Sequence, residues 1–98
     1  MKVRWIVWKD IYLEKIQRKH SVTPEEVEQV FSRNSIFRKA EKGKVTGEDL
    51  YVAYGRSEAG RYLTVVFIIK QPNGALPISA RNMTKAERRY YEKRKKIG

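Results

Sequence analysis

Apolar residues follow a helical period in the first third of the chain and a strand pattern in the middle. Residues 5–8 (WIVW) are aromatic and β-branched, which predicts a short first strand. In the next segment Tyr12, Ile16 and His20 share one helical face. We therefore expect a first helix that begins near Asp10, a residue able to cap it, and ends near His20.

A second helix is predicted by its starting residues. Thr23 can accept hydrogen bonds from the free N–H groups of the first turn, Pro24 suits the first helical position, and Glu26 completes a capping box. Residues 27–31 then carry an apolar stripe, and the helix is expected to end at residues 32–34.

After the second helix, the sequence predicts several strands joined by short links, followed by a last helix. We expect strands at residues 36–41, 50–54, 61–70 and 76–80, with turns at residues 43–47, 57–60 and 72–74. The near-continuous apolar centre of the third of these strands is typical of a middle strand covered on both faces. Thr84 and Glu87 form another capping box, which opens a helix through about Lys95.

These elements predict an α+β two-layer fold. A short N-terminal strand and two helices come first, a four-stranded antiparallel sheet follows, and a C-terminal helix closes the chain. We expect the helices to lie on one face of the sheet. The length of 98 residues predicts a single domain over residues 1–98, with a basic C-terminal tail at residues 93–98.

Charge narrows the classes of partner. The chain has 22 Lys and Arg against 11 Asp and Glu, a net charge of +11. Such a surplus favours a nucleic acid, an anionic membrane surface or an acidic protein as partner, although a merely basic soluble domain has the same composition. We expect no membrane partner, because no predicted helix pairs a large apolar face with a basic one while leaving the core supplied. Eight basic and two acidic residues follow position 80, so this segment carries +6 of the total.

Other features exclude some functions. The chain lacks cysteine and has one histidine, so a zinc site is not expected, and no glycine-rich phosphate loop or nucleophile elbow is present. We predict no metal and no cofactor. The apolar run at residues 63–69 is too short to span a membrane, and the N-terminus is not a signal peptide, so we expect a cytoplasmic protein.

Several segments, in order, carry a resemblance to a known family. They are residues 18–22 (RKHSV), 25–31, 47–57 (GEDLYVAYGRS), 60–67 (GRYLTVVF) and 78–92. Together they resemble the BrnT-like toxins, whose fold is similar to that of RelE-type ribonucleases. Two positions depart from the family pattern: Ser21 replaces a glycine, and Asp49 follows Glu48 where the family has an arginine.

The resemblance implies a metal-independent endoribonuclease that slows translation. It also implies a BrnA-like protein antitoxin, with operator DNA bound only through the antitoxin complex. A different class of function remains open, because a non-catalytic RNA- or DNA-binding module would use the same basic face. A third interpretation, a protein whose basic surface binds an acidic partner, is compatible with the first.

Arg56 and Arg81 are the first candidates for the chemistry. Cleavage of RNA without a metal requires stabilisation of the negative charge that grows on the phosphate, and a guanidinium group does this with two hydrogen bonds. Each arginine is placed at the end of a predicted strand, so we expect both to line one anion site. The alternative is that they are surface arginines paired with carboxylates.

The other candidates have comparable alternatives. His20 can act as acid or base, yet it can equally cap its helix, and Lys19 beside it can contact phosphate or be solvated. In the last helix Tyr91 can stack on a base, move a proton or pack in the core, whereas Tyr90 is expected in the core. The remaining predicted RNA contacts are Glu48 (also a candidate base), Arg88, Arg89 and Lys93.

Overall fold

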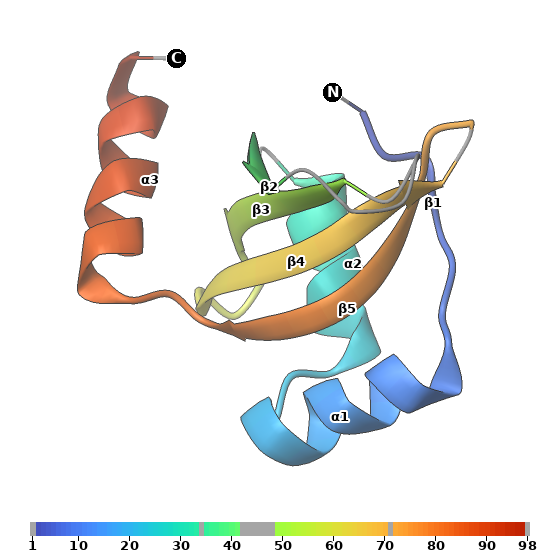
Figure 1. Cartoon of the computed structure of the whole chain (residues 1–98). Coiled ribbons are helices and arrows are strands. Elements are labelled where there is room, and N and C mark those ends of the chain that lie inside the picture. The colour runs from blue at the N-terminus through green and yellow to red at the C-terminus, as the bar shows by residue number, and fades with distance from the viewer. Residues whose placement is uncertain (1, 34, 42–48, 71, 98) are drawn as a thin grey trace.

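The computed structural model describes residues 2–33, 35–41, 49–70 and 72–97, which form three helices and one five-stranded sheet (Figure 1). The elements are β1 (Trp5–Ile6), α1 (Asp10–His20), α2 (Pro24–Ser32), β2 (Ile36–Glu41), β3 (Leu50–Arg56), β4 (Tyr62–Lys70), β5 (Gly74–Asn82) and α3 (Lys85–Ile97). Each expected element is present, with ends within two residues of those predicted. The expected turn at residues 43–47 and Glu48 lie outside the described residues.

The sheet has the order β1-β5-β4-β3-β2. Strands β2 to β5 form the expected antiparallel hairpins, and β4 is central, as its apolar sequence predicts. The expectation of a four-stranded sheet was wrong, because β1 pairs in parallel with β5 and makes the sheet mixed. A Cβ at Gly74 would come within 2.7 Å of the Trp5 ring, so glycine is required where the two strands meet.

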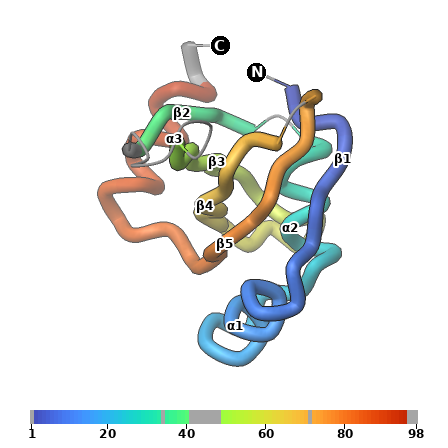
Figure 2. The backbone as a smooth tube through the Cα atoms, turned by 45° about the vertical axis from the view of Figure 1, so that its right-hand side comes forward, coloured from blue at the N-terminus to red at the C-terminus, as the bar shows by residue number. Residues whose placement is uncertain are grey.

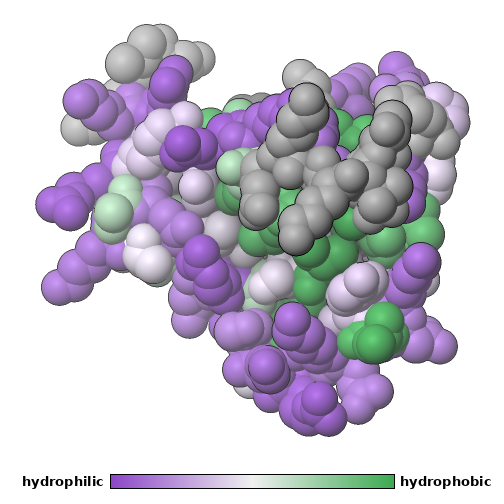
Figure 3. All heavy atoms as spheres, viewed as in Figure 1, coloured by the Kyte–Doolittle hydropathy of each residue, from purple (hydrophilic) through white to green (hydrophobic). Residues whose placement is uncertain are grey.

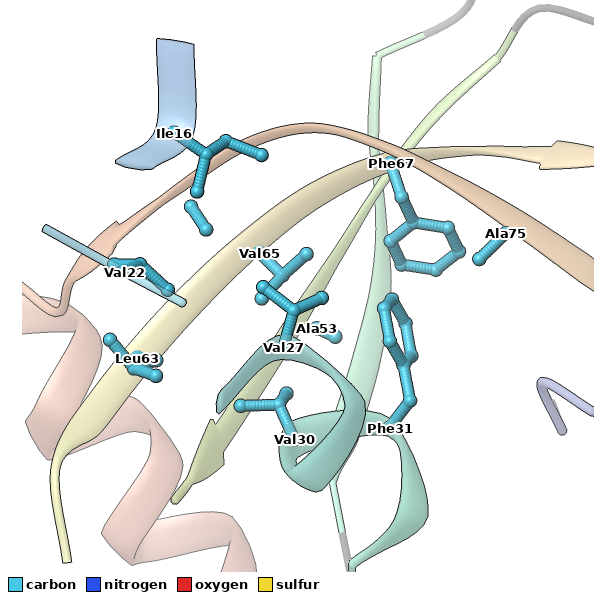
Figure 4. Packing of buried hydrophobic residues seen from close by; sticks show 11 residues of the cluster. Ile16, Val22, Val27, Val30, Phe31, Ala53, Leu63, Val65, Phe67 and Ala75 are labelled. Atoms are coloured by element: carbon cyan, nitrogen blue, oxygen red, sulfur yellow. The ribbon is translucent and has the colours of Figure 1, made fainter. Parts of the chain in front are cut away.

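The larger core lies between the sheet and the helices α1 and α2 (Figure 4). The rings of Phe31 and Phe67 meet edge to face at 5.0 Å between centroids. The buried members of this core are Ile16, Val22, Val27, Val30, Phe31, Ala53, Leu63, Val65, Phe67, Ala75 and Ala80. Burial of these side chains is the main driving force for the fold.

Helix α3 covers the opposite face of the sheet (Figure 2). Residues alternate between faces along a strand, so Val52 and Tyr54 of β3 point away from the larger core and pack with Tyr91 of α3. The expectation that all helices lie on one face was therefore wrong. The sequence misses this because two adjacent tyrosines leave the apolar face of α3 poorly defined.

At two of the three helices, the first turn is capped by the side chains that the sequence predicts. Thr23 and Glu26 form a complete capping box at α2, and Thr84 and Glu87 exchange the equivalent bonds at α3. Helix α1 differs, because its N-cap is Lys9, which makes no side-chain cap bond, and Asp10 is already helical. In the described part of the chain, no helix is long and apolar enough to cross a membrane.

Candidate functional site

Arg56 is held at the end of β3 by a tight turn. Its Nε donates to the carbonyl oxygen of Gly60 at 3.3 Å. The turn is closed by the buried Ser57, whose Oγ accepts from the N–H of Arg61 at 3.1 Å. Gly60 has φ +90, and a Cβ there would lie 3.0 Å from Arg56 Nη2, so glycine both permits the turn and leaves room for the guanidinium group.

Tyr62 organises the surface beside Arg56. The guanidinium carbons of Arg56 and Arg88 lie over its ring, at 4.5 Å and 3.9 Å from the centroid. Its hydroxyl donates to Glu92 Oε1 at 2.7 Å, and its ring meets Tyr91 edge to face at 6.0 Å between centroids. Cation–π contacts and the charge-assisted hydrogen bond thus join β3, β4 and α3 at one place.

Two adjoining hollows share Arg56, Tyr91 and Lys95, and we refer to them together as the Arg56 groove. The larger has a volume of about 480 Å³ and is also lined by Arg33, Ser57, Glu58 and Gly60. The smaller, of about 310 Å³, is also lined by Tyr62 and Glu92. Three cations, two tyrosines and two carboxylates therefore face one open groove, an arrangement suited to binding a phosphate and moving a proton.

Arg81 lies on the same face of the sheet as Arg56. In the register of β4, Arg56 is opposite Tyr62 and Arg81 is opposite Thr64, so both arginines point to the side covered by α3. Arg81 does not line either hollow of the Arg56 groove. The two arginines therefore share one face of the sheet, as a common anion site would require. The single anion site expected for them is not formed by these side chains.

Glu87 holds Arg81 in place. The guanidinium group donates to both carboxylate oxygens, at 2.7 Å and 2.9 Å. Thr64 Oγ1 and the N–H of Thr84 also donate to Glu87, at 3.1 Å and 2.8 Å. The hydrogen bonds from Arg81 lower the pKa of Glu87 to about 2, and the same pairing raises the pKa of Arg81. This pairing is the alternative that the sequence left open for Arg81.

Tyr91 packs in the smaller core, one of the alternatives that the sequence left open, and Tyr90 packs against that core. Tyr91 is 3% exposed and forms a buried wall of the Arg56 groove, so its ring faces are not presented to solvent for stacking. Tyr90, expected in the core, is half-buried, and Arg38 and Arg94 lie over its ring at 5.0 Å and 5.2 Å. The sheet-facing stripe of α3 therefore passes through Tyr91.

The outer side of α3 is basic. Lys85, Arg88, Arg89 and Lys93, with Glu92, line a third hollow of about 670 Å³. Figure 3 shows hydrophilic side chains over this part of the molecule, at the left of the view. The three predicted contacts Arg88, Arg89 and Lys93 are thus brought together, next to the Arg56 groove, with which this hollow shares Glu92.

His20 and Lys19 lie at the end of α1, which packs on β5 on the other face of the sheet. Lys19 is exposed, His20 is half-buried, and neither lines the Arg56 groove. The carbonyl oxygen of His20 accepts from Arg61 Nη2 at 3.0 Å, so this helix end has a structural connection to the residue just before β4. A role for either residue in RNA chemistry stays a prediction, and Glu48 lies outside the described residues.

Seven of the nine residues that line the Arg56 groove were not predicted as site residues. They are Arg33, Ser57, Glu58, Gly60, Tyr62, Glu92 and Lys95. Arg33 and Lys95 are basic, but nothing local distinguishes them from the other 20 basic residues. Glu92 was part of the recognised pattern at residues 78–92, and its spacing four residues after Arg88 was a usable signal. Among the described residues no group of His, Cys, Asp and Glu could hold a metal ion.

Comparison with known proteins gives a family and a fold. The model of a family described as "Ribonuclease toxin, BrnT, of type II toxin-antitoxin system" matches residues 8–87. A crystal structure of the Brucella abortus ribonuclease toxin BrnT superimposes with a TM-score of 0.58 at 15% sequence identity, covering 85% of this chain and 100% of that one. At this identity the likeness shows the fold alone. No curated protein matches the chain.

Proposed function

The chain belongs to the BrnT family of ribonuclease toxins of type II toxin–antitoxin systems, and from this membership we propose that it is a metal-independent endoribonuclease that inhibits translation. The observation that supports the proposal is the Arg56 groove. It combines a fixed guanidinium group, further cations and proton-transferring side chains at one place. These are the groups that cleavage of an RNA phosphodiester requires.

The proposed reaction is an internal displacement at phosphorus. The 2′-oxygen loses its proton and bonds to the phosphorus, the bond to the 5′-oxygen breaks, and that oxygen takes up a proton. Arg56 would donate hydrogen bonds to the phosphate oxygens as their charge grows, because its fork geometry matches them. Arg33 and Lys95 add positive charge to the groove, which supplies without a metal what a metal would otherwise provide.

The α3 surface fits the remainder of the substrate. Lys85, Arg89 and Lys93 recur every four residues, a rise of about 6 Å along a helix, so they present a row of cations beside the groove. Such a row binds the backbone of single-stranded RNA without reading its sequence. We propose that Arg88, Arg89 and Lys93 hold RNA that enters the Arg56 groove.

A protein antitoxin is part of the same proposal. We propose that a BrnA-like antitoxin neutralises the chain and that operator DNA is bound only through their complex. The strongly basic surface supports this, because it would attract an acidic partner as well as RNA.

The test is cleavage of single-stranded RNA by the purified protein in the presence of a chelator. We expect cleavage, and a rate about 100-fold lower for Arg56→Ala, because removal of one donor to the developing charge typically has an effect of this size. Arg18→Ala is the matched control: this exposed arginine pairs with Glu14 on α1 and is expected to leave the rate unchanged.

Two outcomes would contradict the proposal. Binding of RNA without any cleavage would instead indicate the non-catalytic nucleic-acid-binding module. Cleavage that is equal in the parent and in Arg56→Ala would show that the reaction takes place elsewhere.

A further inference from the structure

We propose that Glu92 is the general base of the Arg56 groove, the group that removes the proton from the attacking 2′-hydroxyl of RNA. The proposal rests on the ribonuclease function proposed above and adds a catalytic residue to it. It is carried by the position of the Glu92 carboxylate, its hydrogen bond to Tyr62 and the surroundings of the other carboxylates.

The carboxylate is close to the cations that would hold the phosphate. Glu92 lines the smaller hollow together with Arg56, Tyr62 and Lys95. The Arg56 guanidinium lies over the same Tyr62 ring whose hydroxyl is 2.7 Å from Glu92 Oε1. A phosphate bound by Arg56 in this hollow would therefore place its neighbouring ribose near Glu92.

Glu92 is both oriented and accessible. The Tyr62 hydroxyl fixes the direction of the carboxylate, and Arg88 Nε lies 3.6 Å from Oε1. The side chain of Glu92 is 48% exposed, so a substrate can reach it. A general base needs this combination of a fixed orientation and contact with the substrate.

The other described acid–base groups fit the role less well. Glu87 accepts two hydrogen bonds from Arg81 and one each from Thr64 and Thr84, and its pKa of about 2 makes it a weak base. His20 lies on the opposite side of the sheet. Glu58 is the other carboxylate in the groove, but it lines the larger hollow, which Tyr62 does not reach.

The proton balance of the step is complete. Glu92 takes the proton of the 2′-hydroxyl while the 2′-oxygen bonds to phosphorus, and the 5′-oxygen leaves as a hydroxyl with a proton from water. The hydroxide so formed takes the proton from Glu92, and the ionised carboxylate is restored. The products are a 2′,3′-cyclic phosphate and a 5′-hydroxyl end.

Glu92→Gln tests the proposal by single-turnover cleavage over the acidic pH range. Among the described residues, the ionisable side chains that face the carboxylate or line a hollow with it are Tyr62 of β4, Arg56 of β3, and Lys85, Arg88, Arg89, Tyr91, Lys93 and Lys95 of α3. Tyrosine, lysine and arginine as residue types do not change charge at acidic pH, so a rise in the parent rate with pH there reports a carboxylate. We expect Glu92→Gln to be at least about 100-fold slower and to lose this rise.

Two further measurements separate a general base from a structural residue. The glutamine carbonyl can still accept from Tyr62, so we expect an unchanged thermal unfolding midpoint and undiminished affinity for 2′-O-methyl RNA, which lacks the attacking hydroxyl. In Glu92→Ala, added formate can occupy the vacated space and should restore part of the rate. Glu14→Gln and Glu14→Ala are matched controls, because Glu14 forms the comparable exposed pair with Arg18 on α1.

The outcomes are distinguishable. A parent protein that does not cleave RNA would overturn the ribonuclease function, and the role of Glu92 with it. A parent that cleaves, with Glu92→Gln equally fast and equally dependent on pH, would overturn the role of Glu92 alone. Loss of the acidic rise in Glu58→Gln but not in Glu92→Gln would assign the base to Glu58.

Discussion

At the residue scale, the two strand-end arginines show how side chains of one type on one face acquire different roles. Arg56 is turned to an open groove by a glycine turn and a tyrosine ring. Arg81 is bound at both nitrogens by Glu87, which also caps α3. An arginine that donates to both oxygens of a carboxylate must give up these bonds to bind phosphate, so Arg81 is better suited to holding α3 on the sheet.

The Glu87–Arg81 pair predicts a pH-dependent stability. The pKa of Glu87 in the folded protein is about 2, below its ordinary value of 4.5, so the pair stabilises the fold fully above pH 4.5. This contribution is lost as the pH falls from 4.5 through 2. We expect Glu87→Gln to lower the free energy of unfolding at pH 7 by about 2 kcal/mol. The pKa shift alone would correspond to a larger free energy, but Arg81 is partly exposed and solvent screens the pair.

Urea unfolding at a series of pH values measures this effect. The parent should lose stability between pH 5 and pH 2 more steeply than Glu87→Gln does. Glu14→Gln, in an exposed pair, should change the free energy of unfolding by less than about 1 kcal/mol at pH 7. Parallel pH profiles for the parent and Glu87→Gln would show that the pair does not stabilise the fold.

Single residues also show what the sequence can predict about the site. Arg56 was predicted to lie at a strand end because a strand, its end and a turn are local features, and the structure places it there, lining the groove. Arg33 and Lys95 were missed because Arg33 follows α2 and Lys95 belongs to α3, so they meet Arg56 only through the packing of those helices on opposite faces of the sheet. Core packing was left as one of several alternatives for Tyr91 because neighbouring helical positions differ by only about 100°, and both Tyr90 and Tyr91 pack at the smaller core.

At the element scale, the sequence predicted correctly the elements that depend on neighbouring residues. It gave no signal for the pairing of strands that are distant in the sequence. Capping boxes at Thr23 and Thr84 and the apolar run in β4 depend on neighbouring residues, and the structure has these elements where the sequence places them. The pairing of Trp5 with Gly74 joins residues far apart in the sequence, and a strand of two residues has too few positions to specify its partner.

The basic row on α3 predicts a salt dependence. If Lys85, Arg89 and Lys93 each neutralise one phosphate, replacing all three by glutamine should reduce the slope of log affinity against log salt by about 2, since each contact to a single strand contributes about 0.7. The measurement is binding of 2′-O-methyl RNA over a range of salt concentrations.

A matched triple variant serves as the control. Lys2, Lys9 and Lys15 are exposed and precede α2 in the chain, away from the hollow on α3. Replacing them by glutamine removes the same total charge, so it should weaken binding slightly and leave the slope nearly unchanged. An equal loss of slope in both triple variants would indicate that RNA responds to net charge and does not follow α3.

At the scale of the whole molecule, the two faces of the sheet are packed unequally. The face under α1 and α2 buries eleven residues, including Ile16 and Phe67. The face under α3 buries Val52, Tyr54 and Tyr91, and guanidinium groups lie over half-buried tyrosine rings there. Because apolar burial dominates stability, α3 is expected to separate from the sheet more readily than the other elements.

Amide hydrogen exchange tests this difference. We expect amides in the last two turns of α3 to exchange at least about 100-fold faster than those of β4, because opening of α3 exposes little apolar surface. The Arg56 groove combines Arg56 of β3 and Arg33, which follows α2, with Lys95 of α3. A bound phosphate would bridge these like charges, so 2′-O-methyl RNA should slow exchange in α3 and leave β4 unchanged. Exchange in α3 that is as slow as in β4 without RNA would show that the cation–π contacts hold the helix as firmly as the larger core holds the sheet.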